Sequence, residues 1–306
     1  MLYMHIGAIL AKLSSESLLS LYPIFVKKIG ISSTLQLWTR LITYVAISSI
    51  FVDWSFIKGS ITSLDAITLG LVNLSHIYFS YEGFRHLDSG VSFAIFNSYP
   101  LMILLIAGLT GLTKGSLWHN SYILVFAGLA LFIYGNSREL RSPMAGPSGL
   151  PAGGPCVKHP PYLSDEPENF NYGLAMILLA ALTEAFIYFL IRRIPTSNHW
   201  NHVFIAYFLG AMLTSGTMFF TEGTKGINDI RVLLSMVING IIGSVGYFLR
   251  FFASYRLEPE VYAPLSYFGV VMSYVYGILF NNEKLNISKV LGTVSILASN
   301  YFAPKV

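Results

Sequence analysis

Two carboxylates inside apolar segments are the residues best placed to do chemistry in this sequence. Glu16 and Glu184 each follow a hydroxyl residue, Ser15 and Thr183 respectively. Ionisable side chains in such segments are costly, and they mark a transport pathway or an ion pair. Two carboxylates that face one cavity can bind a cationic group or take up protons. Lys12 lies four residues before Glu16, so mutual neutralisation on one helical face is the open alternative.

A polar stripe on another apolar segment gives the second candidate. Asn73, His76 and Ser80 recur at steps of three and four residues, which places them on one helical face. A shift of 170 residues brings His76 onto Gly246 and Ser80 onto Arg250. We interpret these faces as two walls of a cavity. The alternatives are close helix packing at the glycines, which we favour for them, extension of Arg250 to the headgroups, and a purely structural hydrogen bond for His76.

Three further residues complete the candidate binding site. Asn97 corresponds to Tyr267 under the same shift, and both offer neutral hydrogen bonds near the middle of an apolar segment. Tyrosines of the membrane interface are the alternative for Tyr267. Arg40 either pairs with Glu16 or meets an anionic group of the substrate, and the sequence does not separate these two roles.

The composition places the chain in a lipid bilayer. Hydrophobic residues make up 54% and charged residues 11% of the 306 residues, and the mean hydropathy is +0.61. A soluble domain of this length is much less apolar, and a bilayer span needs about 20 apolar residues. The sequence predicts an all-α protein with ten transmembrane helices near residues 5–25, 34–52, 64–81, 89–112, 121–136, 172–191, 203–221, 232–252, 261–280 and 287–302.

The second half of the chain repeats the layout of the first. The shift of 170 residues aligns Gly70 with Gly240, Leu87 with Leu257 and several other identical pairs without a gap. Because each half holds five spans, the second copy must be inserted upside down, which is the arrangement of an alternating-access transporter. The sequence therefore predicts a first five-helix repeat (1–136), a flexible Pro/Gly-rich linker (137–170) and a second five-helix repeat (171–306).

Several function classes are disfavoured. The single cysteine, Cys156, excludes an internal disulfide and a cysteine-based metal cluster. The formal charge of +4 and the lack of long basic runs give no reason to expect nucleic-acid binding. No metal motif, phosphate loop or nucleophile elbow occurs in a usable context. We therefore predict no enzyme activity, no cofactor, no catalytic residues and no metal site.

The end of the chain resembles a known family. The stretch LEPEVYAPLSYFGVVMSYVYGILFNNEKLNISKVLGTVSILASN is similar to the end of an EamA-type repeat of the drug/metabolite transporter superfamily. The shared features are the P-L-S-Y start, Glu283 at the end of the ninth span and Gly292 in the tenth. Thr113 and Val270 depart from the family pattern. The resemblance implies ten helices around a central cavity, alternating access and small organic solutes, and it implies that Glu283 closes the end of its helix.

Together these observations predict a multi-pass membrane transporter. The expected function is secondary export or exchange of a small polar metabolite that is amino-acid-like, nucleotide-sugar-like or otherwise anionic or zwitterionic. The partners are this solute and the lipid bilayer, and proton or counter-substrate coupling stays open, as does the choice between plasma and intracellular membranes. The alternative is a membrane-embedded enzyme or accessory protein that acts on a lipid-linked substrate. The expected substrate-binding residues are Glu16, Arg40, His76, Asn97, Glu184, Arg250 and Tyr267.

Overall fold

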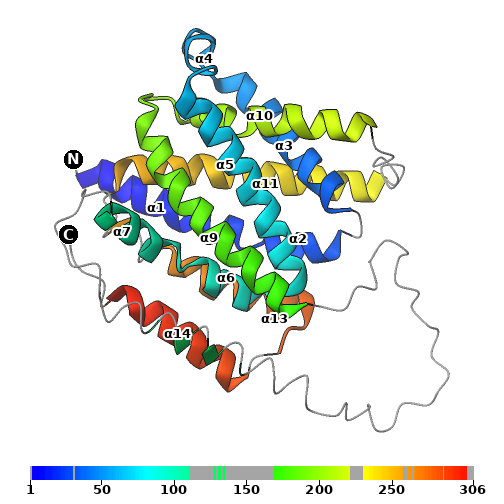
Figure 1. Cartoon of the computed structure of the whole chain (residues 1–306), viewed down its shortest axis with the longest axis vertical. Coiled ribbons are helices and arrows are strands. Elements are labelled where there is room, and N and C mark those ends of the chain that lie inside the picture. The colour runs from blue at the N-terminus through cyan, green and yellow to red at the C-terminus, as the bar shows by residue number, and fades with distance from the viewer. Residues whose placement is uncertain are drawn as a thin grey trace.

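The described part of the computed structural model of the protein consists of helices (Figure 1). The structure describes residues 2–29, 32–109, 124, 127–128, 130–131, 134, 169–220, 230–257, 261–262, 265–284 and 286–301. Most of the predicted fifth span and almost all of the predicted linker lie outside these residues. The helices are α1 (Leu2–Leu19), α2 (Tyr22–Lys28), α3 (Ser33–Phe51), α4 (Trp54–Ser60), α5 (Leu64–His86), α6 (Ser89–Phe96), α7 (Tyr99–Leu109), α9 (Phe170–Arg193), α10 (His199–Phe220), α11 (Ile230–Arg256), α13 (Tyr267–Asn281) and α14 (Ile287–Tyr301).

Short polar residues set the starts of several helices. Ser32, Ser63 and Asn169 accept hydrogen bonds from backbone N–H groups in the first turns of α3, α5 and α9. Asp53 does the same for α4, in a connection outside the long helices. Hydrogen bonds from the Ser55 hydroxyl and from the N–H groups of Phe56 and Ser55 hold the pKa of the Asp53 carboxyl below its usual range. These caps satisfy N–H groups that have no partner within a helix.

Helices from the first half of the chain pack mainly against helices from the second half. The first helix of each half lies along the long third-span helix of the other half: α1 packs on α11, and α9 packs on α5. The neighbouring pairs α3 with α11 and α10 with α5 follow the same rule, and α3 also packs on α10. In Figure 1, α5 and α9 run side by side across the bundle, while α14 lies along its lower edge. Each half therefore completes the core of the other.

Three helical segments are long and apolar enough to cross a membrane: Ile6–Lys28, which joins α1 and α2, Phe170–Arg193 and Ile230–Arg256. The helices α4 and α5 pass the same test together, but they are bent by 93° relative to each other. All described elements are helices, so the all-α prediction is confirmed for this part of the chain. The arrangement of ten spans as an inverted repeat stays a prediction.

The fourth predicted span, 89–112, is divided into two helices. α6 ends at Phe96, and α7 begins at Tyr99 with Pro100 in its first turn. A proline lacks the N–H that would continue the helix, and its ring clashes with the carbonyl four residues before it, which here belongs to Phe96. The prediction of one continuous helix was therefore wrong at this point. Under the 170-residue shift, Asn97 at the break corresponds to Tyr267, where α13 begins.

Glycines on α11 allow other helices to approach its backbone closely. A Cβ atom added at Gly240 would lie 2.6 Å from Thr43 Cβ on α3, and one at Gly246 would lie 2.8 Å from Leu19 Cδ2 on α1. A Cβ atom at Gly243 would overlap the hydroxyl groups of Tyr22 and Tyr44. The packing interpretation of this glycine face agrees with these contacts. Small residues at such contacts are typical of helix interfaces in membranes.

We expect Gly243→Ala to destabilise the protein by about 1–3 kcal/mol, because the added methyl group overlaps two buried tyrosine hydroxyls that have little space to move. Gly216→Ala on α10 is the matched control, since a Cβ atom there has no neighbour within 4 Å. Denaturation of the two purified variants in detergent measures the difference. Equal stability of both variants would contradict the close packing of α11.

Candidate functional site

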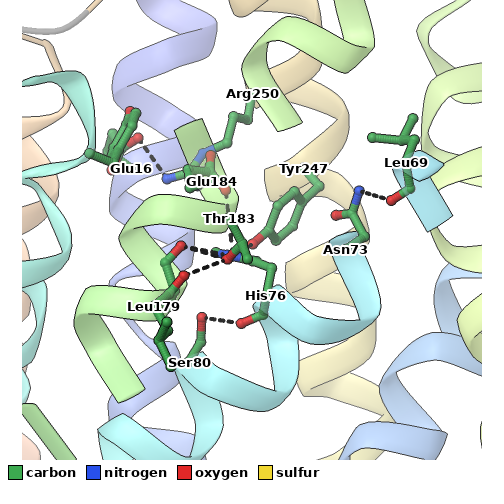
Figure 2. Close-up of polar contacts among 12 residues, drawn as sticks. Glu16, Leu69, Asn73, His76, Ser80, Leu179, Thr183, Glu184, Tyr247 and Arg250 are labelled. Atoms are coloured by element: carbon green, nitrogen blue, oxygen red, sulfur yellow. Dashed lines mark hydrogen bonds and ion pairs between the residues drawn. The ribbon is translucent and has the colours of Figure 1, made fainter. Parts of the chain in front are cut away.

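A buried ion-pair network joins three helices in the middle of the bundle. On α11, the Arg250 guanidinium donates from Nη1 to Glu184 Oε1 on α9 and from Nη2 to Glu16 Oε1 on α1, both at 2.9 Å (Figure 2). Lys12, one turn before Glu16, also donates to Glu16 Oε1. Lys12 and Glu16 are fully buried, and Arg250 is 2% exposed. The alternative in which Arg250 extends to the headgroups does not agree with this burial.

His76 on α5 extends this network. Its Nε2 lies 3.5 Å from Glu184 Oε2 and 3.1 Å from the hydroxyl of Tyr247, while its Nδ1 lies 3.1 Å from the carbonyl oxygen of Ala180. The carbonyl can only accept, so Nδ1 carries the proton. Neutral histidine then accepts at Nε2 from the Tyr247 hydroxyl, as Figure 2 places these groups. Protonation of Nε2 would instead allow an ion pair with Glu184, which makes this contact sensitive to a proton.

Aromatic residues surround the lysine side of the network. The Lys12 ammonium lies 3.8 Å from the centre of the Tyr262 ring and 3.2 Å from the Tyr99 hydroxyl. The Tyr99 hydroxyl also lies 2.7 Å from the Ser266 hydroxyl. A buried ammonium is stabilised by the face of an aromatic ring as well as by a carboxylate. Lys12 is therefore bound by several residues of the buried polar cluster, and Glu16 is only one of its partners.

Arg40 on α3 lies in a second cluster, lined by tyrosines. Its guanidinium carbon is 3.8 Å from the Tyr22 ring centre, with further rings at 5.1 Å (Tyr81), 5.3 Å (Tyr44) and 5.6 Å (Tyr247). Its Nε donates to the Tyr44 hydroxyl at 2.8 Å. Arg40 takes part in none of the ion pairs of the described residues, so the Arg40–Glu16 pair, one of the two alternatives for Arg40, does not form in this conformation. Tyr247 contacts both clusters.

A cavity of about 20 Å³ lies between the two clusters. Arg40, His76, Ser80, Tyr247 and Arg250 contribute to its lining. This volume has room for about one water molecule. The site is therefore closed in this conformation, and an organic solute requires the helices to move apart.

The structure brings four of the predicted site residues into one contact network: Glu16, His76, Glu184 and Arg250. Arg40 shares the cavity. Asn97 is buried, but its amide donates to the carbonyl of Phe93 in its own helix at 2.8 Å. The Tyr267 hydroxyl is buried with no hydrogen-bond partner in the described part of the chain. That the predicted residues bind substrate stays a prediction.

Sequence reasoning did not select six tyrosines that line these clusters: Tyr22, Tyr44, Tyr81, Tyr99, Tyr247 and Tyr262. The chain has 19 tyrosines, and most positions in an apolar segment offer no signal that separates an interior tyrosine from an interfacial one. One signal was present. Tyr44 lies four residues after Arg40, so both occupy one face of a helix.

Glu283 lies at the end of the bundle and holds the two halves together. Its carboxylate accepts from the backbone N–H of Ser89 at 2.9 Å and from the Ser89 hydroxyl at 2.6 Å, so it caps α6 from the end of α13. Lys27 at the end of α2 lies 3.3 Å from the same carboxylate. A separate opening of about 520 Å³ is lined there by Glu283, Asp88 and several lysines. The expected structural role of Glu283 agrees with these contacts.

A metal centre finds no support in the described ranges, where no group of three His, Cys, Asp or Glu side chains could hold an ion. The polar atoms of the network instead form ion pairs and hydrogen bonds with one another. Three of them are left over: Arg250 Nε, Glu16 Oε2 and Glu184 Oε2 are buried without a hydrogen-bond partner in this part of the chain. Buried polar atoms without a partner are rare, and they are expected where a ligand can bind.

The comparisons with known proteins agree with a membrane transporter fold. A solved structure described as the crystal structure of a protein aligns with a TM-score of 0.57 and 14% identity over 97% of this chain and 97% of that chain. No curated protein has a significantly similar sequence. Residues 171–303 match the model of the EamA-like transporter family. The protein is thus an integral multi-pass membrane protein whose residues 171–303 are similar to the EamA-like transporter family.

Proposed function

We propose that the protein is a secondary exporter or exchanger of a small polar organic metabolite. The substrate is amino-acid-like, nucleotide-sugar-like or otherwise anionic or zwitterionic, and it crosses by alternating access between two inverted five-helix repeats, 1–136 and 171–306, joined by the linker 137–170. One observation carries this proposal. Charged side chains from α1, α9 and α11 meet in the centre of the bundle, at the contacts between the two halves.

The pairing of the helices supports this movement. The contact of α1 with α11 and the contact of α9 with α5 are equivalent under exchange of the halves. In an inverted repeat, equivalent contacts open on opposite sides of the membrane, and the site between them is exposed to each side in turn. The Glu16–Arg250 ion pair spans the contact of α1 with α11, and the His76–Glu184 contact spans that of α5 with α9. One of these two interactions must therefore rearrange when either helix contact opens.

A transport assay separates this proposal from the alternative. Purified protein is first screened by thermal shift against a panel of metabolites, because a ligand of the folded state raises its apparent stability. The compounds that bind are then radiolabelled and offered to sealed proteoliposomes. A transporter accumulates or exchanges the intact compound, whereas a membrane enzyme changes its substrate in detergent, where no compartments exist. Chemical conversion in detergent without vesicle uptake would overturn the proposal.

We expect Glu184→Gln to reduce the transport rate by at least about tenfold, and to reduce stability much less. The glutamine keeps the size and a hydrogen-bond acceptor for Arg250 at 2.9 Å, but it removes the charge that meets Arg250 and His76. Arg250 retains Glu16 as its counter-ion. A tenfold change in rate corresponds to about 1.4 kcal/mol, which is within the range of one buried charged hydrogen bond.

The measurement is initial uptake into proteoliposomes as a function of pH, with the midpoint of thermal unfolding recorded for the same preparation. Ser235→Ala is the control, since this hydroxyl on α11 is exposed and donates only to the Arg231 carbonyl. Normal transport by Glu184→Gln at every pH would remove Glu184 from the proposed site.

A further inference from the structure

The buried centre of the bundle contains one more positive than negative side chain. Lys12, Arg40 and Arg250 are cationic, and Glu16 and Glu184 are anionic, while His76 is neutral in the tautomer that its contacts favour. All are at most 4% exposed. Burial of a net charge is unfavourable unless a counter-ion compensates for it. Within the described residues, this centre therefore has an excess of one positive charge.

The excess charge belongs to Arg40. Lys12 and Arg250 both contact Glu16, and Arg250 also contacts Glu184, so the two carboxylates are shared by two cations. Arg40 is surrounded by tyrosine rings and a tyrosine hydroxyl instead of a carboxylate. The rings attract a cation but carry no net charge. A guanidinium in this state retains its affinity for a planar anion.

The cavity of about 20 Å³ is lined by Arg40 and by a second arginine that has a hydrogen-bond donor without a partner. Arg250 also lines this cavity, and its Nε is buried without a hydrogen-bond partner in the described part of the chain. Tyr247 and His76 lie between the two arginines. A carboxylate or phosphate group in an opened cavity could accept from both guanidinium groups, which is the geometry that such anions prefer.

We propose that the space between Arg40 and Arg250 is an anion subsite, and that the transported solute carries one more negative than positive charge. This inference rests on the proposed transport function and specifies its substrate. One oxygen of each carboxylate, Oε1, is paired with a cation, and the other, Oε2, has no hydrogen-bond partner among the described residues. The excess of one positive charge in the buried centre, and not the number of free acceptors, therefore sets the net charge of the solute. The tyrosines around Arg40 would contact the apolar or flat part of the solute.

Matched pairs of compounds test the subsite on the purified full-length protein. The probes are phenylacetate with phenylacetamide, benzoate with benzamide, and phenyl phosphate with phenol, with phenylalanine as the zwitterion. We expect the anion of at least one pair to bind about tenfold or more tightly than its neutral partner or the zwitterion. The carboxylate and phosphate pairs distinguish the two kinds of anion. Arg40→Gln should abolish this preference, and Arg40→Lys should retain it in part.

The stability of the ligand-free protein gives a second, independent readout. Arg40→Met should leave the midpoint of thermal unfolding unchanged or raise it, because it removes a buried charge that has no counter-ion. Arg250→Met, the same substitution at a paired arginine, should lower the midpoint. A purely structural role for Arg40 predicts a lower midpoint for Arg40→Met and no change in anion preference.

The proposal is overturned if the wild-type protein shows no anion preference, or if the preference survives in Arg40→Gln. Vesicle uptake distinguishes this failure from that of the proposed function. If the protein transports neutral or cationic solutes and shows no anion preference, the anion-subsite proposal is wrong and the proposed transport function stands. If anions bind in a way that depends on Arg40 but no bound compound is taken up, the proposed transport function is wrong and the anion-subsite proposal stands.

Discussion

Replacement of Arg250 by methionine is expected to lower the free energy of unfolding by about 3–5 kcal/mol, the usual effect of breaking a buried ion pair by removing one partner. Methionine fills a similar volume, so the effect is electrostatic. Glu16 then retains only Lys12, and Glu184 loses its guanidinium at 2.9 Å and keeps a histidine contact at 3.5 Å. Denaturation of purified protein in detergent measures the change, and vesicle uptake should be lost as well.

A surface arginine provides the control for Arg250→Met. Arg193 lies 3.6 Å from Asp65, but its side chain is 69% exposed. Solvent screens such a pair, and Arg193→Met should change the stability by no more than about 1 kcal/mol. Combining Arg250→Met with Glu184→Gln should recover part of the lost stability, because the unpaired carboxylate is removed. An Arg250→Met protein as stable as the wild type would contradict the central role of this ion-pair network.

The sequence predicted the helices better than the way they pack. Apolar segments of about 20 residues coincide with α1–α2, α9 and α11, because bilayer-like burial requires them to be apolar. The internal repeat at 170 residues predicts equivalent helices in the two halves, and this stays a prediction. It did not reveal that α1 would pack on α11 and α9 on α5, because a repeat in sequence does not specify which surfaces of the two copies meet.

For the candidate site, polar residues inside apolar segments were a usable signal. Glu16, Glu184 and Arg250 were selected for being expensive to bury, and they converge because ion pairing reduces that expense. Asn97 was selected on the same grounds, but an amide can also donate to the carbonyl four residues before it, as Asn97 does. A neutral polar side chain can satisfy its hydrogen bonds within its own helix, whereas a buried charge needs a counter-ion.

The two interpretations of Glu16 in the sequence are both realised in the structure. Lys12 pairs with Glu16 along one face of α1, as the spacing of four residues allows. The same oxygen, Oε1, also accepts from Arg250 on α11. A local pair therefore does not exclude a role between helices. Spacing along one helix could not show this second partner, which lies 234 residues away in the sequence.

Because Glu16 holds two cations, Glu16→Gln is expected to destabilise the protein by about 3–5 kcal/mol, more than Glu184→Gln does. The glutamine leaves Lys12 with aromatic and hydroxyl contacts alone, and Arg250 with Glu184 as its only carboxylate. Denaturation of both glutamine variants in detergent measures the order. Combining Glu16→Gln with Lys12→Met should restore part of the stability, since it removes the cation that has lost its counter-ion. If Glu184→Gln were the more damaging of the two, Glu16 would not be the carboxylate that joins α1 to α11.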